Sequence, residues 1–161
     1  MGNIFSGSEI VEIGIQIEKN GRDFYETLLQ KGSNPKTKEV FGFLAKEEEK
    51  HIKVFQGMLD SLDKNDPPES YPGEYFAYMN ALASEYIFTK QNMGKQLAQK
   101  TSSDKEALDL GIGFEKDSIV FYEGMKKSVP EYDLKVMDGL INQEQQHLRM
   151  LVELKAPGLT E

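Results

Sequence analysis

Both histidines of this chain stand three residues after a glutamate, as Glu48 with His51 and Glu144 with His147. On a helix, residues three apart lie on the same face, so each pair presents a carboxylate and an imidazole side by side. Carboxylate oxygen with imidazole nitrogen is a ligand set that suits iron or manganese and tolerates zinc. Because the pair occurs twice in 161 residues, the spacing predicts a site for two metal ions.

An internal repeat surrounds the two pairs. A segment that reads Glu-Lys, four residues, then Phe-Tyr-Glu begins at Glu18 and is nearly copied from Glu115. Each copy precedes one glutamate–histidine pair, so the chain is one two-helix unit written twice. The sequence contains no cysteine, which excludes disulfides and thiolate metal sites. A metal is therefore expected to be held by carboxylates and imidazoles.

The polar pairs occupy positions that a helix normally fills with apolar side chains. Glu48 and His51 interrupt an apolar helical stripe that includes Leu44. A buried carboxylate is costly unless it is paired or bound to a metal. Glu18 and Glu115 border the corresponding stripe of the preceding segment in each copy. Small residues in those stripes, at positions 14, 21, 111 and 118, are expected to leave room between the helices.

The six side chains are expected to meet at one level of a helix bundle. Counted from the hairpin turns, the four glutamates lie at heights that differ by only a few ångströms, at ~1.5 Å rise per residue. Their charge of −4 would be balanced by two divalent cations, and without metal some would take up protons. Two glutamates are expected to bridge the metals and the other two to bind one metal each. The predicted metal ligands are Glu18, Glu48, His51, Glu115, Glu144 and His147.

Two tyrosines are expected to support the ligand carboxylates through their hydroxyls. Tyr25 and Tyr122 follow Glu18 and Glu115 by two helical turns on the same face. The alternative for the tyrosines is core packing with a satisfied hydroxyl. The alternative interpretation of the glutamate–histidine pairs is a contact on the helix surface. The alternative for Glu18 and Glu115 is an exposed position on a helix. The remaining acidic neighbours are expected to be solvated, namely Glu12, Glu26, Glu47, Glu49 and Glu123.

Helical periodicity and boundary signals divide the chain into two helix hairpins. The first hairpin spans about residues 6–64, with Ser6 and Asn34 as helix caps. The second spans about residues 103–156, with Ser103 as the cap of its first helix. Short turns within each hairpin make the paired helices antiparallel.

A long connection separates the two hairpins. It covers about residues 65–102, too many for an ordinary bundle loop, and its middle has a helical pattern. We therefore expect one domain over residues 1–161. The predicted fold is all-α, a ferritin-like four-helix bundle made of two antiparallel helix hairpins joined by a long, partly helical crossover.

Composition excludes several classes of partner. The formal net charge of −8 argues against a nucleic-acid surface and against docking on anionic lipid. No apolar run approaches the length that spans a bilayer, and the first residues lack the features of a secretory signal. We therefore expect a cytoplasmic protein that binds neither nucleic acid nor membrane.

The duplicated E-x-x-H pairs and the Glu-Lys-x-x-x-x-Phe-Tyr segments resemble the rubrerythrin-like branch of the ferritin-like di-iron carboxylate proteins, over nearly the whole chain. The resemblance implies a homodimer that binds two iron ions, with manganese or zinc as alternatives, at the six residues named above. It also implies peroxide or dioxygen as the oxidant. Full-length rubrerythrin receives electrons through a rubredoxin domain, whose iron is held by four cysteines. Because this sequence has no cysteine, a separate donor such as a rubredoxin-like protein is expected.

One position departs from the rubrerythrin pattern. Rubrerythrin has an additional glutamate one helical turn after its third-helix ligand, and this sequence has Ser118 there. The same six ligand types serve peroxidases, oxidases and ferroxidases. The functions considered are therefore a di-iron oxidoreductase, a ferroxidase or iron-handling protein, and a non-redox structural protein whose two metals staple the bundle.

Overall fold

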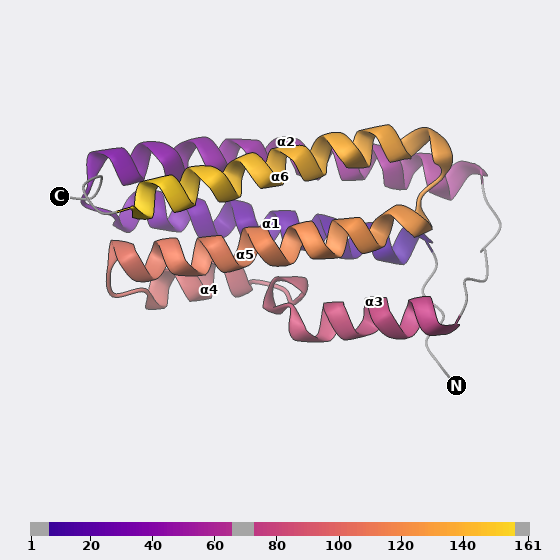
Figure 1. Ribbon diagram of the computed structural model, residues 1–161, viewed down its shortest axis with the longest axis horizontal. Helices are drawn as coiled ribbons and strands as arrows, with labels where there is room; N and C mark the ends of the chain where they lie inside the picture. Colours follow the sequence, from indigo (N-terminus) through magenta and orange to yellow (C-terminus); the bar gives the residue numbers. More distant parts are fainter. Residues whose placement is uncertain (1–6, 66–72, 157–161) are drawn as a thin grey trace.

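The structure is a computed structural model that describes residues 7–65 and 73–156. Four long helices lie side by side along one axis, with two shorter helices against them (Figure 1). The described residues form α-helices and two short 3-10 helices and contain no strand, which confirms the all-α prediction. None of these helices is long and apolar enough to cross a membrane.

The first hairpin consists of α1 (Gly7–Lys31) and α2 (Pro35–Asn65). Asn34 starts α2, because its side-chain oxygen accepts hydrogen bonds from the backbone N–H groups of Lys36 at 3.0 Å and Thr37 at 3.2 Å. Pro35 takes the first helical position, where a missing N–H is tolerated. The cap expected at Ser6 lies outside the described residues.

The second hairpin consists of α5 (Asp104–Met125), the 3-10 turn η2 (Lys126–Ser128) and α6 (Glu131–Lys155). The Ser103 hydroxyl caps α5 by accepting a hydrogen bond from the Glu106 N–H at 3.1 Å. The Glu106 carboxylate accepts from the N–H of Ser102 at 2.9 Å rather than from Ser103. Helix α1 packs on α2, α5 packs on α6, and the hairpins meet through α1 with α5 and α2 with α6. This is the predicted four-helix bundle.

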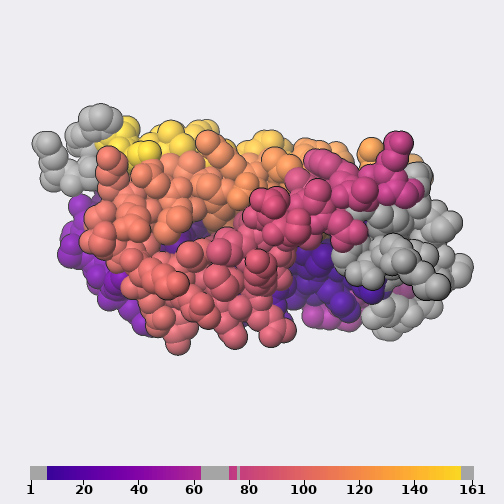
Figure 2. Space-filling model, turned by 90° about the horizontal axis from the view of Figure 1, so that it is seen from below, coloured from indigo at the N-terminus to yellow at the C-terminus, as the bar shows by residue number. Residues whose placement is uncertain are grey.

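The crossover contains two α-helices, whereas its sequence pattern indicated one helical middle segment. Helix α3 (Gly73–Glu85) packs on α5, and α4 (Met93–Lys100) packs on α1, with η1 (Ile87–Thr89) between them. Asn92 precedes α4 in the left-handed conformation, with φ 60°, which asparagine tolerates better than most residues. Figure 2 shows the crossover, coloured magenta to salmon, lying over one side of the bundle.

Asn20 fastens this crossover to α1. Its buried side-chain amide donates to the carbonyls of Phe88 and Lys90, at 2.6 Å each, and its side-chain oxygen accepts from the N–H of Gly94 at 3.0 Å. A Cβ at position 94 would collide with the backbone carbonyl of Asn20, so only glycine permits this approach of α4 to α1. The turn of α1 that follows Glu18 is therefore tied to the crossover.

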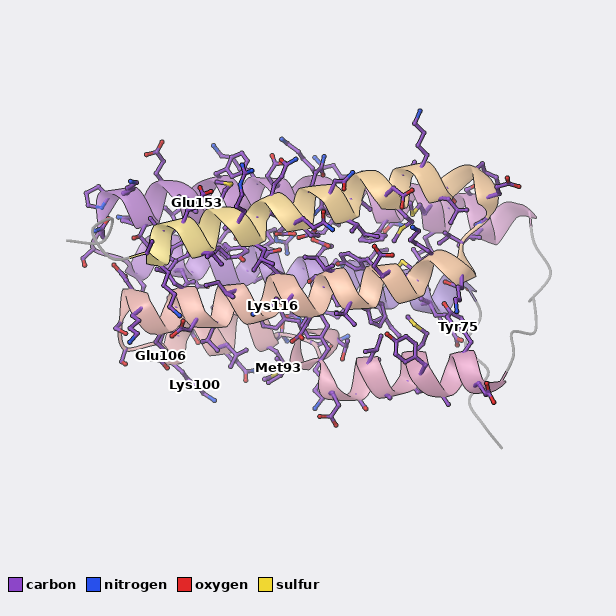
Figure 3. The ribbon with its side chains drawn as sticks, viewed as in Figure 1. Tyr75, Met93, Lys100, Glu106, Lys116 and Glu153 are labelled. Atoms are coloured by element: carbon purple, nitrogen blue, oxygen red, sulfur yellow. The ribbon has the colours of Figure 1, made fainter. Side chains whose placement is uncertain are left out.

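The start of α3 is held against the end of α5. The Tyr75 hydroxyl donates a 2.7 Å hydrogen bond to the carbonyl of Gly124 (Figure 3). A Cβ at Gly124 would lie 2.7 Å from the sulfur of Met79, so the glycine allows α3 to pack closely. Together with Asn20, these contacts fix the crossover along the length of the bundle.

The small residues of the helix stripes accommodate large side chains from the facing helix. A Cβ at Gly21 would lie 2.5 Å from the ring of Phe114, and one at Gly14 would lie 2.9 Å from the methyl group of Met125. The room expected at these two positions is thus filled by protein. Metal ions would therefore be held in the space that the six predicted ligand side chains themselves enclose.

Candidate metal centre

Six polar side chains from the four bundle helices meet in the interior. Helices α1 and α5 contribute one glutamate each, and α2 and α6 contribute a glutamate and a histidine each. None of the six is more than 2% exposed. These residues are the six that the sequence pattern singled out, Glu18, Glu48, His51, Glu115, Glu144 and His147.

The six side chains form two overlapping groups of four. Within each group, the candidate ligand atoms lie within 4.8 Å of one another. The groups are Glu18, Glu48, His51 and Glu144, and Glu48, Glu115, Glu144 and His147. Glu48 and Glu144 are common to both. The geometry is that of two cation positions that share two carboxylates, with one further carboxylate and one imidazole at each.

Both histidines turn Nδ1 toward the carboxylates. The distances from His51 Nδ1 are 2.7 to 3.4 Å, to oxygens of Glu144, Glu48 and Glu18. The distances from His147 Nδ1 are 3.3 to 3.8 Å, to oxygens of Glu144, Glu48 and Glu115. The two rings stack with centroids 5.5 Å apart and planes 18° apart. Each imidazole therefore faces carboxylates from both hairpins.

Hydrogen bonding within the protein leaves the inner atoms of this cluster without partners. Buried polar atoms are normally satisfied, and each exception needs an explanation. Here the Nδ1 atoms of both histidines and at least one oxygen of each of the four glutamates have no hydrogen-bond partner. These atoms converge on two shared positions, as the ligands of two cations would. The residues present thus fit two metal ions, through six oxygen atoms and two nitrogen atoms.

Two buried tyrosines bond the carboxylates crosswise. The hydroxyl of Tyr25 on α1 donates to Glu115 on α5 at 2.6 Å. The hydroxyl of Tyr122 on α5 donates a short hydrogen bond to Glu18 on α1. Each tyrosine therefore supports the glutamate of the other repeat copy, although both follow a glutamate on their own helix.

A family model for rubrerythrin matches residues 9–155. The chain belongs to the rubrerythrin family. One solved structure similar to it is that of a Thermotoga maritima protein for which a ferritin-like diiron-carboxylate character has been suggested. The two are 28% identical, with a TM-score of 0.73, over 96% of this chain and 97% of that chain. None of the curated proteins matches this chain.

Membership of the rubrerythrin family and the buried cluster together make this a diiron-carboxylate family protein with a Glu/His metal site. The family match agrees with the resemblance carried by the two E-x-x-H pairs. It does not distinguish among the metals that such a site accepts, nor among the reactions that the family site supports.

Without metal, the centre of this rubrerythrin-family protein holds protons. Burial raises the pKa of Glu18 and Glu115 well above the ordinary value, and neighbouring carboxylates raise it further. Burial alone would lower the pKa of His147, but contacts with the neighbouring glutamates have the larger effect and raise this pKa to about 12. The pKa of His51 is raised for the same reasons. Two imidazolium ions and two protonated carboxyls leave the cluster neutral, as two divalent cations would.

The other two glutamates complete this charge pattern. Burial by itself raises the pKa of Glu48 and Glu144. Close contacts of Glu48 with Glu18 and of Glu144 with Glu115, together with the contacts to both histidines, lower these pKa values by more, so both stay ionised. They are also the two carboxylates common to both groups. The shared pair is therefore charged even before a metal binds, whereas the unshared pair must lose protons.

Tyr86 is a neighbour of the site that the sequence motifs did not indicate. It comes from the crossover, is buried, and its hydroxyl lies 2.8 Å from the Ser118 hydroxyl and 3.0 Å from the carbonyl of Phe114. Ser118 takes the place of the additional rubrerythrin glutamate, and here it is buried against a tyrosine instead. Burial raises the pKa of Tyr86 well above its ordinary value, so it stays a neutral donor. Tyr86 also lines a surface groove of about 260 Å³ beside α3 and α5.

The histidine side of the centre carries two more polar residues. Gln143 places its side-chain oxygen 2.7 Å from Nε2 of His51. Glu47 was expected to be solvated, but its side chain is only 14% exposed and groups with both histidines. That expectation was wrong because α6 packs over this part of α2. The expectation holds for Glu12, Glu26 and Glu123, which are exposed, while Glu49 is half-exposed and pairs with Arg22 at 2.9 Å.

Proposed function

We propose that this protein is a di-iron carboxylate oxidoreductase of rubrerythrin type, which reduces peroxide or dioxygen with electrons from a separate donor protein. The observation that carries the proposal is the pair of four-residue groups that share Glu48 and Glu144. Such an arrangement would hold two cations next to each other, where two one-electron donors can act together on a small oxidant. The proposed metal ligands are Glu18, Glu48, His51, Glu115, Glu144 and His147, with Glu48 and Glu144 bridging.

The division of labour between metal and protein follows from the side chains present. Two iron ions, when bound, supply the two electrons that convert hydrogen peroxide and two protons to two waters. The protein holds the ions, orients their ligands and limits the access of solvent. Tyr25 and Tyr122 orient Glu115 and Glu18 by donating to them. Manganese and zinc remain alternatives to iron, because the ligand set accepts all three.

The electron donor is proposed to be a separate, rubredoxin-like protein. An iron of the rubredoxin kind needs four cysteines, and these 161 residues contain none. We propose that the oxidised centre is reduced across a protein surface. We propose a homodimer for the oxidoreductase, in contrast to the large shell that iron storage requires.

The direct test is the reaction of the ferrous protein with peroxide. The protein is loaded anaerobically with two ferrous ions per chain and mixed with hydrogen peroxide in a stopped-flow spectrometer. Oxidation much faster than that of free ferrous iron is expected for the wild type and lost in Glu48→Ala. Glu49→Gln, which alters a half-exposed carboxylate beside the bridging residue, serves as the control. A wild-type rate equal to that of free iron would overturn the proposal.

A ferroxidase or iron-handling role is the second candidate, and Ser118 is the observation that favours it. Position 118 has no carboxylate here, and the Tyr86 hydroxyl lies against the Ser118 hydroxyl instead. Gel filtration separates the candidates, since a large shell points to storage and a dimer to the oxidoreductase. Metal analysis of protein from its native host tests the structural alternative, because full occupancy by zinc would contradict both redox roles.

A further inference from the structure

The two copies of the repeat differ at the position directly before each shared glutamate. Glu47 and Gln143 stand directly before the two shared glutamates, Glu48 and Glu144, and so hold equivalent places in the two hairpins. The six candidate ligands themselves are repeated without change of type. A carboxylate in one copy thus corresponds to an amide in the other.

Gln143 supports the histidine of the opposite hairpin. Its side-chain oxygen lies 2.7 Å from Nε2 of His51. Because Nδ1 of His51 faces the carboxylates of the centre, Nε2 carries the ring proton and donates it to the amide oxygen. This contact fixes the orientation and tautomer of His51 with a neutral acceptor.

Glu47 lies near His147 from the equivalent place in the first hairpin, but less closely than Gln143 lies to His51. A carboxylate oxygen of Glu47 lies within 4.8 Å of a ring nitrogen of His147 and of His51. Nδ1 of His147 is turned to the shared glutamates, and Nε2 of His51 is taken by Gln143, so Nε2 of His147 is the ring nitrogen that remains for Glu47. The side chain of Glu47 is only 14% exposed and is paired with Lys50 at its outer edge. Its charge is therefore poorly solvated and close to the imidazoles of the centre.

We propose that Glu47 and Gln143 are positioning residues that make the two metal positions unequal, with the position that contains His147 binding a divalent cation more tightly. A carboxylate next to the outer nitrogen makes the imidazole a stronger ligand and adds a negative charge near the cation. An amide orients the ring without either effect. This inference rests on the proposed two-metal site and predicts that the site fills in order, first at His147 and then at His51.

Cobalt(II) titration of the metal-free protein tests this order, because the visible absorption of the bound ion reports each position. We expect two binding steps for the wild type, separated by about 10–100-fold in affinity. Glu47→Gln should weaken the tighter step until the two steps nearly coincide, while Gln143→Glu should tighten the weaker one. The double variant with both substitutions should restore two steps with their spectra exchanged, an outcome that a general loss of packing does not produce.

The controls separate the carboxylate of Glu47 from its ion pair. Lys50→Gln removes the surface partner and keeps the carboxylate, and we expect both steps to remain as in the wild type. Glu47→Asp, which retains the charge, should recover part of the separation. If two cobalt ions bind but Glu47→Gln leaves both affinities within about twofold of the wild type, the inference is overturned and the proposed site stands. If the wild type does not bind two cobalt ions, the proposed function fails first.

Discussion

Tyr25 on α1 donates a 2.6 Å hydrogen bond to Glu115 on α5, across the boundary between the two repeat copies. Tyr122 makes the converse bond to Glu18. Neither hairpin therefore contains a complete environment for its own first glutamate. The two hairpins complete each other, which ties the geometry of the centre to their relative placement.

Removal of the Tyr25 hydroxyl should destabilise the protein. Tyr25→Phe leaves a buried oxygen of Glu115 without its donor, at an expected loss of about 1–3 kcal/mol in the free energy of unfolding. Chemical denaturation of the metal-free protein measures it. Tyr132→Phe, which alters a tyrosine that is 60% exposed, is the matched control and should change stability little. Equal effects of the two substitutions would contradict a special role for the Tyr25 hydroxyl.

Glu18→Gln should change the stability of the metal-free protein and its affinity for metal in opposite directions. In the metal-free protein the raised pKa of Glu18 favours the neutral form, and glutamine is neutral at nearly the same size. The variant is expected to gain stability near neutral pH without metal, because folding no longer requires protonation of this carboxylate, and to bind metal more weakly. Urea unfolding and metal stoichiometry measure the two effects. Glu12→Gln on the exposed face of α1 should alter neither.

The stability of the metal-free protein should fall as pH rises above neutrality. The folded-state pKa of His147, about 12, lies above the ordinary value of 6.5, so its stabilising contribution is present below about pH 6.5 and is lost toward about pH 12. The raised pKa values of Glu18 and Glu115 act in the same direction above their ordinary value of 4.5. Thermal unfolding between about pH 6 and pH 9 measures the trend.

Metal should reverse this pH dependence. Ligands must be deprotonated to bind a cation, so loading releases the protons held by His51, His147, Glu18 and Glu115. The increase in melting temperature on addition of metal is expected to grow from about pH 6 to about pH 8. A pH indicator in weakly buffered solution detects the released protons directly. A pH-independent increase, with no proton release, would show that the metal-free centre is not protonated as described.

The E-x-x-H pairs and their apolar surroundings were sufficient to predict the bundle and the six residues that meet in it. That success has a simple cause, since a helical stripe that turns polar in the core is visible in a single sequence. The crosswise bonds of Tyr25 and Tyr122 depend on the lateral packing of α1 on α5, which periodicity along one helix does not report. Glu47 was misjudged for the same reason, because its exposure depends on where α6 lies over α2.

The crossover shows a second limit of sequence reasoning. Its α4 segment is only eight residues long and ends at Lys100, too short for a clear periodic signal. The helix is held by tertiary contacts with Asn20, a residue whose role has no local signature. Tertiary packing therefore decides structure where local preference is weak.

Truncation of Tyr86 should open the centre to solvent. Tyr86→Ala removes the ring that lies between the groove and Ser118, so bound metal is expected to be lost to a chelator faster, by about tenfold or more. The rate of metal transfer to a coloured chelator measures this. Tyr78→Ala removes a 49% exposed tyrosine from the same groove and should leave the rate unchanged. Equal rates in both variants would mean that metal leaves by another route.

The anchorage of the crossover by Asn20 has a consequence for how the protein matures. The contacts join residues 68 to 74 positions apart, beside the turn that carries Glu18. Contacts of such separation form late when a chain folds, because the intervening segment must first be ordered. Nascent protein should therefore acquire its metals only after the crossover has docked. The metal content of a preparation would then report its fraction of fully folded molecules.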